Sequence, residues 1–100
     1  MDRFGKELKI EIKVDERMAT GTFSNYTNIT HTHDEFIADF LFLNATPPPG
    51  FGKLISRIIL TPRHAKRILL ALTENITMYE KKYGEIKAAP SPDKSIKNLQ

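Results

Sequence analysis

The chain has 100 residues, of which 40% are hydrophobic and 27% are charged, and this length accommodates one small domain. It contains no cysteine, which excludes a disulfide framework, a thiol nucleophile and a thiolate metal site. Its start has no signal-peptide pattern and no apolar run approaches transmembrane length, so we expect a cytoplasmic protein with no membrane partner.

The net charge of +3 is unevenly distributed along the chain. Residues 18–52 contain three acids and no Lys or Arg, whereas residues 53–67 contain five basic residues and no acid. This asymmetry predicts that the basic block meets either these acids or an anionic partner. The acids are Asp34, Glu35 and Asp39, and the basic residues are Lys53, Arg57, Arg63, Lys66 and Arg67.

Apolar patterns predict three strands in the first half of the chain. Residues 8–14 alternate apolar and polar side chains, which is typical of a half-buried strand. Residues 19–32 are rich in Thr and aromatic residues and form the second predicted strand, in which Gly21 indicates a bulge or a close backbone approach. A turn at His33-Asp34 leads to the third predicted strand, residues 35–43.

The third predicted strand is apolar on both sides. One face carries four apolar side chains, and the other carries three around the single acid Asp39. In a small antiparallel sheet usually only one face is covered, so a second covering partner is implied. The first face consists of Phe36, Ala38, Phe40 and Phe42, and the second of Ile37, Leu41 and Leu43.

A Pro-rich loop over residues 44–52 separates this strand from a fourth, residues 53–60. Alternation places Leu54, Ile58 and Leu60 on one face of the fourth strand, and Ile55, Arg57 and Ile59 on the other.

A long helix is predicted directly after the fourth strand. Thr61 is a typical N-cap, Pro62 fits the first helical position, and Gly84 ends the helix after Tyr83. Residues 85–100 are rich in Pro, Ser and Lys and predict a disordered tail. The helix carries an apolar stripe made of Ala65, Leu69, Leu72, Ile76, Tyr79 and Tyr83, flanked by Ile68.

The predicted fold is therefore a single α+β domain over residues 1–84. It consists of a four-stranded antiparallel meander followed by one long C-terminal helix. One helix cannot cover both apolar faces of such a sheet, so we expect a homo-oligomer, a dimer or higher.

The junction between the fourth strand and the helix has three interpretations. The helix start is a partial positive charge, yet its first turns carry basic residues and no acid. The junction binds a phosphate or a single-stranded nucleic acid, or it pairs with Asp34, Glu35 and Asp39, or it is a solvated face. The candidate anion-binding residues are Arg57, Thr61, Arg63, Lys66 and Arg67, with Phe51 as a stacking face.

Enzyme signatures are weak, and we expect no cofactor. The sequence contains no Gly-rich phosphate loop, nucleophile elbow or zinc-protease helix motif. Alternate residues on a strand share a side, which makes His31, His33 and Glu35 candidate ligands for a divalent metal. A polar turn is the favoured interpretation of this segment.

The stretch from Ser56 to Gly84, SRIILTPRHAKRILLALTENITMYEKKYG, resembles the signature of a small prokaryotic family classed as a domain of unknown function. Residues 26–40, YTNITHTHDEFIADF, also resemble the second and third strands of that family. The resemblance covers residues 8–84 and implies a bacterial or archaeal origin and a compact sheet-plus-helix protein, but no activity.

Two better-understood families offer looser analogies of fold. The PUR-type repeat, which binds single-stranded nucleic acid, is similar in having four strands followed by one helix. The SecB-type export chaperone is similar in its four antiparallel strands before a helix, and it is an oligomer with apolar client grooves. The sequence therefore leaves two non-enzymatic hypotheses: binding of single-stranded nucleic acid through the basic junction, or a protein-interaction module with a protein client on its second apolar face.

Overall fold

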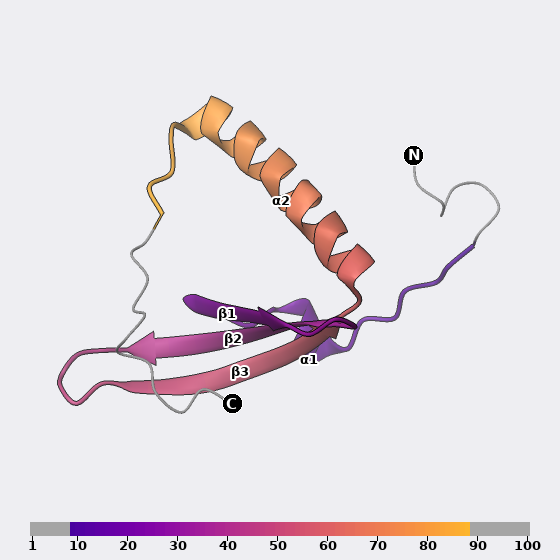
Figure 1. Ribbon diagram of the computed structural model, residues 1–100. Coiled ribbons are helices and arrows are strands. Elements are labelled where there is room, and N and C mark those ends of the chain that lie inside the picture. Colours follow the sequence, from indigo (N-terminus) through magenta and orange to yellow (C-terminus); the bar gives the residue numbers. More distant parts are fainter. Residues whose placement is uncertain (1–8, 89–100) are drawn as a thin grey trace. The chain divides into compact units, whose positions relative to one another are not determined.

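The structure, a computed structural model, describes residues 9–88 and divides the chain into two compact units. The first, Met1–Leu60, contains α1 (Glu16–Ala19), β1 (Tyr26–His31), β2 (Phe36–Asn44) and β3 (Phe51–Leu60). The second, Thr61–Gln100, contains α2 (Pro62–Tyr83) (Figure 1). Leu8 of the first predicted strand and residues 89–100 of the predicted tail lie outside the described residues.

The first unit is built on an antiparallel sheet of three strands in the order β1-β2-β3. A tight turn joins β1 to β2, and in it the backbone N–H of Thr32 donates to the carbonyl oxygen of Glu35 at 2.9 Å. The Thr32 hydroxyl accepts from the backbone N–H of Asp34 at 3.2 Å. The prediction of a turn at His33-Asp34 is therefore confirmed, as is the α+β class with an antiparallel sheet and a C-terminal helix.

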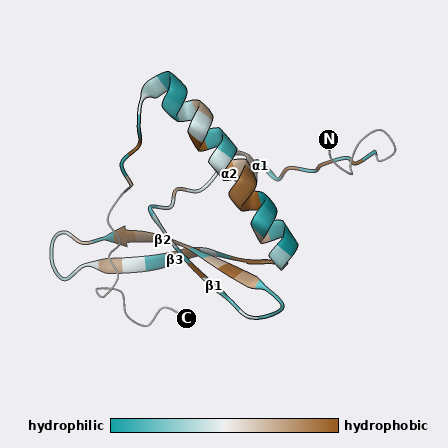
Figure 2. Cartoon of the chain, turned by 45° about the horizontal axis from the view of Figure 1, so that its top comes forward, coloured by the Kyte–Doolittle hydropathy of each residue, from teal (hydrophilic) through white to brown (hydrophobic). Residues whose placement is uncertain are grey.

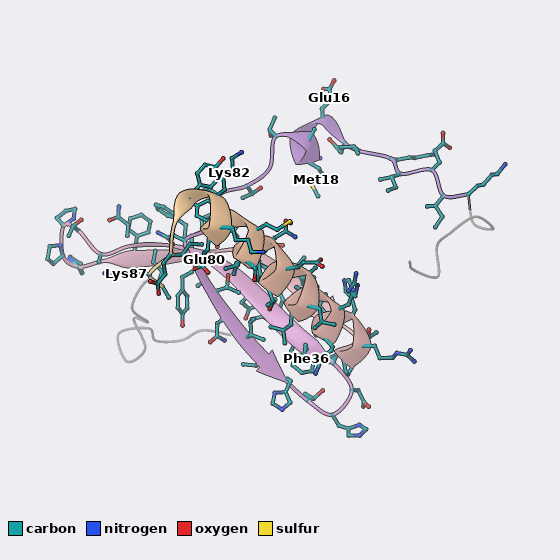
Figure 3. All side chains as sticks on the ribbon, turned by 90° about the horizontal axis from the view of Figure 1, so that it is seen from above. Glu16, Met18, Phe36, Glu80, Lys82 and Lys87 are labelled. Atoms are coloured by element: carbon teal, nitrogen blue, oxygen red, sulfur yellow. The ribbon has the colours of Figure 1, made fainter. Side chains whose placement is uncertain are left out.

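The prediction of four strands is wrong, because the sheet has three. Residues 9–15 form no strand, and the chain instead enters α1, where the Asp15 side chain accepts from the backbone N–H of Arg17 at 2.9 Å. Ile10, Ile12 and Val14 are exposed. Alternation gives a segment an apolar face, but a strand also needs hydrogen bonds to a sheet edge, and the alternation does not supply that edge. In Figure 3, Glu16 and Met18 leave the single turn of α1 in opposite directions.

The second predicted strand is shorter than expected, and Gly21 lies outside it. β1 spans only Tyr26–His31 of the predicted residues 19–32. Gly21 adopts a φ of 80° in the segment between α1 and β1, where no neighbouring atom lies within 4 Å of an added Cβ. Its role is thus a left-handed backbone conformation rather than a close approach.

A bulge in β3 changes which side chains share a face. Phe40 pairs with Ser56, but the next residue, Leu41, pairs with Leu54, so Ile55 has no partner in the register. As a result Leu54 lies on the face of Arg57 and Ile59. The prediction that placed Leu54 with Ile58 and Leu60 assumed unbroken alternation and is wrong.

The most buried residues lie on the central strand β2, which is the most continuously hydrophobic strand in Figure 2. Ala38 and Leu41 are the buried apolar residues of the described chain, and Asp39 between them is 3% exposed. Because β2 has a neighbouring strand on both sides, its backbone and side chains are shielded more than those of the edge strands β1 and β3.

The helix α2 has the predicted bounds. The Thr61 hydroxyl caps it by accepting from the backbone N–H of His64 at 3.2 Å, and Pro62 occupies the first turn. Gly84 ends it at a φ of 104°, and its N–H donates to the carbonyl oxygen of Glu80 at 3.0 Å. Within residues 9–88, no helix has the length and apolar character that crossing a membrane requires.

Candidate interaction surfaces

One face of the sheet gathers four phenylalanines. Phe36, Phe40 and Phe42 alternate along β2, and Phe51 of β3 joins them because it pairs with Asn44. The ring centroids of Phe42 and Phe51 are 6.3 Å apart. We call this surface the phenylalanine face, and it consists of Phe36, Phe40, Phe42 and Phe51 together with Ile29 of β1 and Ile58 of β3.

The phenylalanine face is only partly covered. The three phenylalanines of β2 are half-buried, whereas Phe51, Ile29 and Ile58 are exposed. Phe23, which precedes β1, packs edge-on against Phe42 with a centroid separation of 6.2 Å and is itself exposed. An aromatic surface of this kind offers a large apolar contact area and adaptable packing to another polypeptide.

The opposite face of the sheet, which we call the ion-pair face, holds a bidentate ion pair. Asp39 of β2 and Arg57 of β3 are paired in the sheet register. The Arg57 Nε donates to Asp39 Oδ1 at 2.6 Å, and a terminal guanidinium nitrogen donates to Oδ2 at 3.0 Å. Both carboxylate oxygens of a nearly buried acid are thereby satisfied. The face also carries Leu41, Leu54 and Ile59.

The ion pair fixes the charge state of its acid. The hydrogen bonds from Arg57 hold the pKa of the Asp39 carboxyl below its ordinary value, and they outweigh burial, which acts in the other direction. The same hydrogen bonds raise the pKa of the Arg57 guanidinium. The pair is a structural element of the sheet: it lets a charged side chain occupy the buried centre of β2.

The six predicted anion-binding residues are divided between the two units, with Phe51 and Arg57 in the first and the other four in the second. The Arg57 guanidinium donates hydrogen bonds to the Asp39 carboxylate, so the second interpretation, internal pairing, holds for Arg57. Phe51 and Leu60 are the two ends of β3, which at about 3.3 Å per residue separates them by roughly 30 Å. The Thr61 hydroxyl caps α2. Of the predicted set, Arg63, Lys66 and Arg67 remain as a basic group on α2.

These three basic residues share one side of α2. At about 100° per residue, the three lie within one arc of the helix, in which Arg63 and Arg67 face away from the apolar stripe and Lys66 lies at the edge nearest to it. Within residues 9–88, none of the three takes part in an ion pair. The exposed members of the stripe and its flank are Ile68, Leu69, Leu72, Ile76, Tyr79 and Tyr83.

The three candidate metal ligands do not converge. The His31 ring stacks on Phe36 with a centroid separation of 5.3 Å, and Nδ1 of His33 lies 2.9 Å from Oδ1 of Asp34. Glu35 belongs to the turn before β2. In the described part of the chain, no three His, Asp or Glu side chains are placed to hold a metal ion.

Sequence reasoning missed two contributions to this unit. Asn25, just before β1, uses its side-chain amide like a strand residue: it donates to the carbonyl oxygen of Leu43 at 2.9 Å and accepts from the Leu43 N–H at 2.8 Å. Phe23 extends the phenylalanine face. The sequence signal for Phe23 was its apolar side chain in a polar stretch, whereas nothing in the sequence pattern distinguishes Asn25 from its polar neighbours.

Comparison with known families adds one result. Residues 2–88 match the family described as Protein of unknown function (DUF3467). The chain belongs to this family. The match covers both units of the DUF3467 protein and agrees with the resemblance to a domain of unknown function noted from the sequence. No curated protein and no solved structure matches the chain.

Proposed function

We propose that this DUF3467 protein is an oligomeric, non-enzymatic protein-interaction module whose phenylalanine face binds apolar segments of other polypeptides in a chaperone-like manner. The observation that carries the proposal is the register of the sheet. It gathers Phe36, Phe40, Phe42 and Phe51 on one face, where Ile29 and Ile58 flank them and remain exposed. Exposed apolar patches rimmed by polar residues mark interaction sites.

The chemistry of this face favours an extended apolar segment as its occupant. Each aromatic side chain contributes about 150–250 Å² of contact area, and burial of apolar surface is worth about 25 cal/mol per Å². β1 and β3 are edge strands, so the same sheet also offers unpaired backbone groups beside the phenylalanine face. A client strand would use both features, taking backbone hydrogen bonds from an edge and burying alternate side chains on the face.

Neighbouring isoleucines provide a matched test. Ile58 and Ile59 are adjacent on β3 and point to opposite faces, since they pair with Ala38 and Ile37. Their exposures are 43% and 59%. The experiment dilutes a chemically denatured reporter enzyme into buffer with this protein and follows aggregation by light scattering. The variants are Ile58→Glu on the phenylalanine face and Ile59→Glu on the ion-pair face.

The wild type and Ile59→Glu are expected to suppress aggregation at similar ratios to the reporter, and Ile58→Glu is expected to lose most of the effect. Retained circular dichroism and urea midpoints show that each variant is folded. Equal suppression by both variants, or none by the wild type, contradicts the proposal. Phe51→Ser repeats the test at the far end of the face, so that the conclusion does not depend on Ile58 alone.

A second candidate function is binding of single-stranded nucleic acid, and the specific observation in its favour is the charge of α2. Arg63, Lys66 and Arg67 lie together on α2, without an ion pair among the described residues, and Arg63 and Arg67 lie on the side opposite the apolar stripe. Basic groups displayed in this way attract phosphates, and the first turn of a helix adds backbone N–H donors.

The nucleic-acid hypothesis predicts salt-dependent binding of a fluorescent single-stranded oligonucleotide. The logarithm of affinity should fall with the logarithm of salt concentration at a slope near −0.7 per phosphate neutralised. The double variant Arg63→Glu, Arg67→Glu should abolish binding. The control is the double variant Lys81→Glu, Lys82→Glu, which makes the same change in net charge near the other end of α2 and should still bind. Absence of binding by the wild type at low salt, or equal loss in both variants, rules the hypothesis out.

A further inference from the structure

We propose that the apolar stripe of α2 pairs with α2 of a second copy of this chain, antiparallel and in full overlap. The inference rests on the proposed oligomeric module and names the partner of its helix. The stripe is defined by Ala65, Leu69, Leu72, Ile76, Tyr79 and Tyr83.

The spacing of the stripe is that of a coiled-coil seam. Its successive members are separated by four, three, four, three and four residues, an unbroken heptad pattern through the last 19 residues of α2 (65–83). Its five large side chains are between 38% and 64% exposed. Heptad positions a are then Leu69, Ile76 and Tyr83, and positions d are Ala65, Leu72 and Tyr79.

Side-chain size selects the antiparallel direction. In an antiparallel pair each a residue faces a d residue, so the layers become Tyr83 with Ala65, Tyr79 with Leu69, and Ile76 with Leu72 of the second copy. The largest side chain meets the smallest. A parallel pair would place Ala65 on Ala65 and Tyr83 on Tyr83, leaving a gap at one end and crowding the other. Tyr79 and Tyr83 already pack against each other, with ring centroids 4.9 Å apart.

Charge selects the same arrangement. Lys66, Thr73 and Glu80 occupy the three e positions, and in the antiparallel overlap each e residue faces an e residue of the second copy. Lys66 then faces Glu80 of the second copy, Glu80 faces Lys66 of the second copy, and the two Thr73 side chains meet at the two-fold axis. A parallel pair forms neither ion pair. Figure 3 shows Glu80 and Lys82 on different sides of the last turn of α2, so Lys82 does not occupy the flank that carries Glu80.

The groups concerned are compatible with this pairing. Lys66 makes no ion pair within residues 9–88. Glu80 accepts from the backbone N–H of Ile86 through Oε2, which leaves Oε1 for the Lys66 ammonium. Arg63 and Arg67 lie on the outer side of the helix pair, so dimerisation and nucleic-acid binding do not compete for them.

Cysteine cross-linking tests the geometry, because the chain has no cysteine of its own. The full-length variant Thr73→Cys is expected to give a covalent dimer with a short bis-maleimide. The control Thr77→Cys, one turn further at an outer b position, is expected to stay monomeric on denaturing gels. Leu69→Cys distinguishes a parallel from an antiparallel helix pair. In a parallel pair the two introduced cysteine side chains face each other and oxidise to a disulfide. In the antiparallel pair they are separated by ten residues along the helices and form no disulfide.

Charge reversal provides a second, independent measurement by sedimentation equilibrium. Lys66→Glu and Glu80→Lys should each weaken self-association about fivefold, the loss of two exposed ion pairs, and the double variant should restore it. The control Arg67→Glu should leave it unchanged. Any one of three results overturns the inference: Thr73→Cys does not cross-link, Leu69→Cys forms a disulfide, or the double variant does not restore self-association. These results leave the client-binding proposal intact, because Ile58→Glu and Phe51→Ser, and none of the α2 variants, test the phenylalanine face. A wild type that is monomeric throughout contradicts the oligomeric part of both proposals.

Discussion

Truncation of Leu41 tests how the sheet is stabilised, and Leu54 is its matched control. The two leucines are paired across β2 and β3 on the ion-pair face. Leu41 is 5% exposed and Leu54 is 43% exposed. Replacing either with Ala removes the same three carbon groups from the same face, so the two variants differ mainly in the burial of the side chain.

The expected loss of stability follows from these exposures. Each buried carbon group is worth about 0.8 kcal/mol, so full burial of three is worth about 2.4 kcal/mol. For Leu41 almost all of this is lost, and a partly collapsed cavity brings the cost of Leu41→Ala to about 2–3 kcal/mol. For Leu54 a little over half is lost, about 1.4 kcal/mol, with no enclosed cavity.

Urea denaturation of the full-length protein measures both values at one protein concentration. The midpoint should shift about twice as far for Leu41→Ala as for Leu54→Ala, with an unchanged slope. An equal or larger shift for Leu54→Ala would contradict this expectation, because Leu54 would then be buried by something other than the sheet. The ion-pair face, and not only the phenylalanine face, would have to be an interface.

Three further predictions concern individual residues. Because the Asp39 pKa is lowered in the folded protein, the ion pair contributes its full stability above the unfolded-state pKa of about 3.9 and loses it as pH falls through the lower folded value. Asp39→Asn should therefore reduce the loss of stability at acid pH, as measured by urea midpoints from pH 7 to pH 2.5. Gly84→Ala should cost about 1–3 kcal/mol, seen as a lower thermal midpoint by circular dichroism, because a φ of 104° is strained for any residue with a Cβ; an unchanged midpoint would mean that the C-cap is not formed. Thr61→Ala should cost about 1 kcal/mol by removing the N-cap, and Thr61→Ser should restore most of it; failure of Ser to do so would argue against the hydroxyl's role.

The elements that depend on short-range chemistry could be predicted from the residues alone. The bounds of α2 follow from the cap at Thr61, the proline after it and the glycine at 84, all of which act within one turn of the backbone. The strand β2 and the turn before it follow in the same way from a continuous apolar run and from hydrogen bonds within four residues. The apolar stripe of α2 could likewise be predicted from the sequence, because helical periodicity alone defines it.

The groups that meet across the sheet could not be predicted in this way, because they depend on how the strands pair. The alternating segment before α1 lacked a paired edge, and one bulge at Ile55 moved Leu54 to the other face. Three interpretations of the basic residues were equal in the sequence, and the β2–β3 register resolved Arg57 by pairing it with Asp39. The length of β3, which extends beyond the predicted fourth strand to include Phe51, puts this residue roughly 30 Å from Leu60. Pairing between strands depends on register and edges, which side-chain periodicity within one segment does not encode.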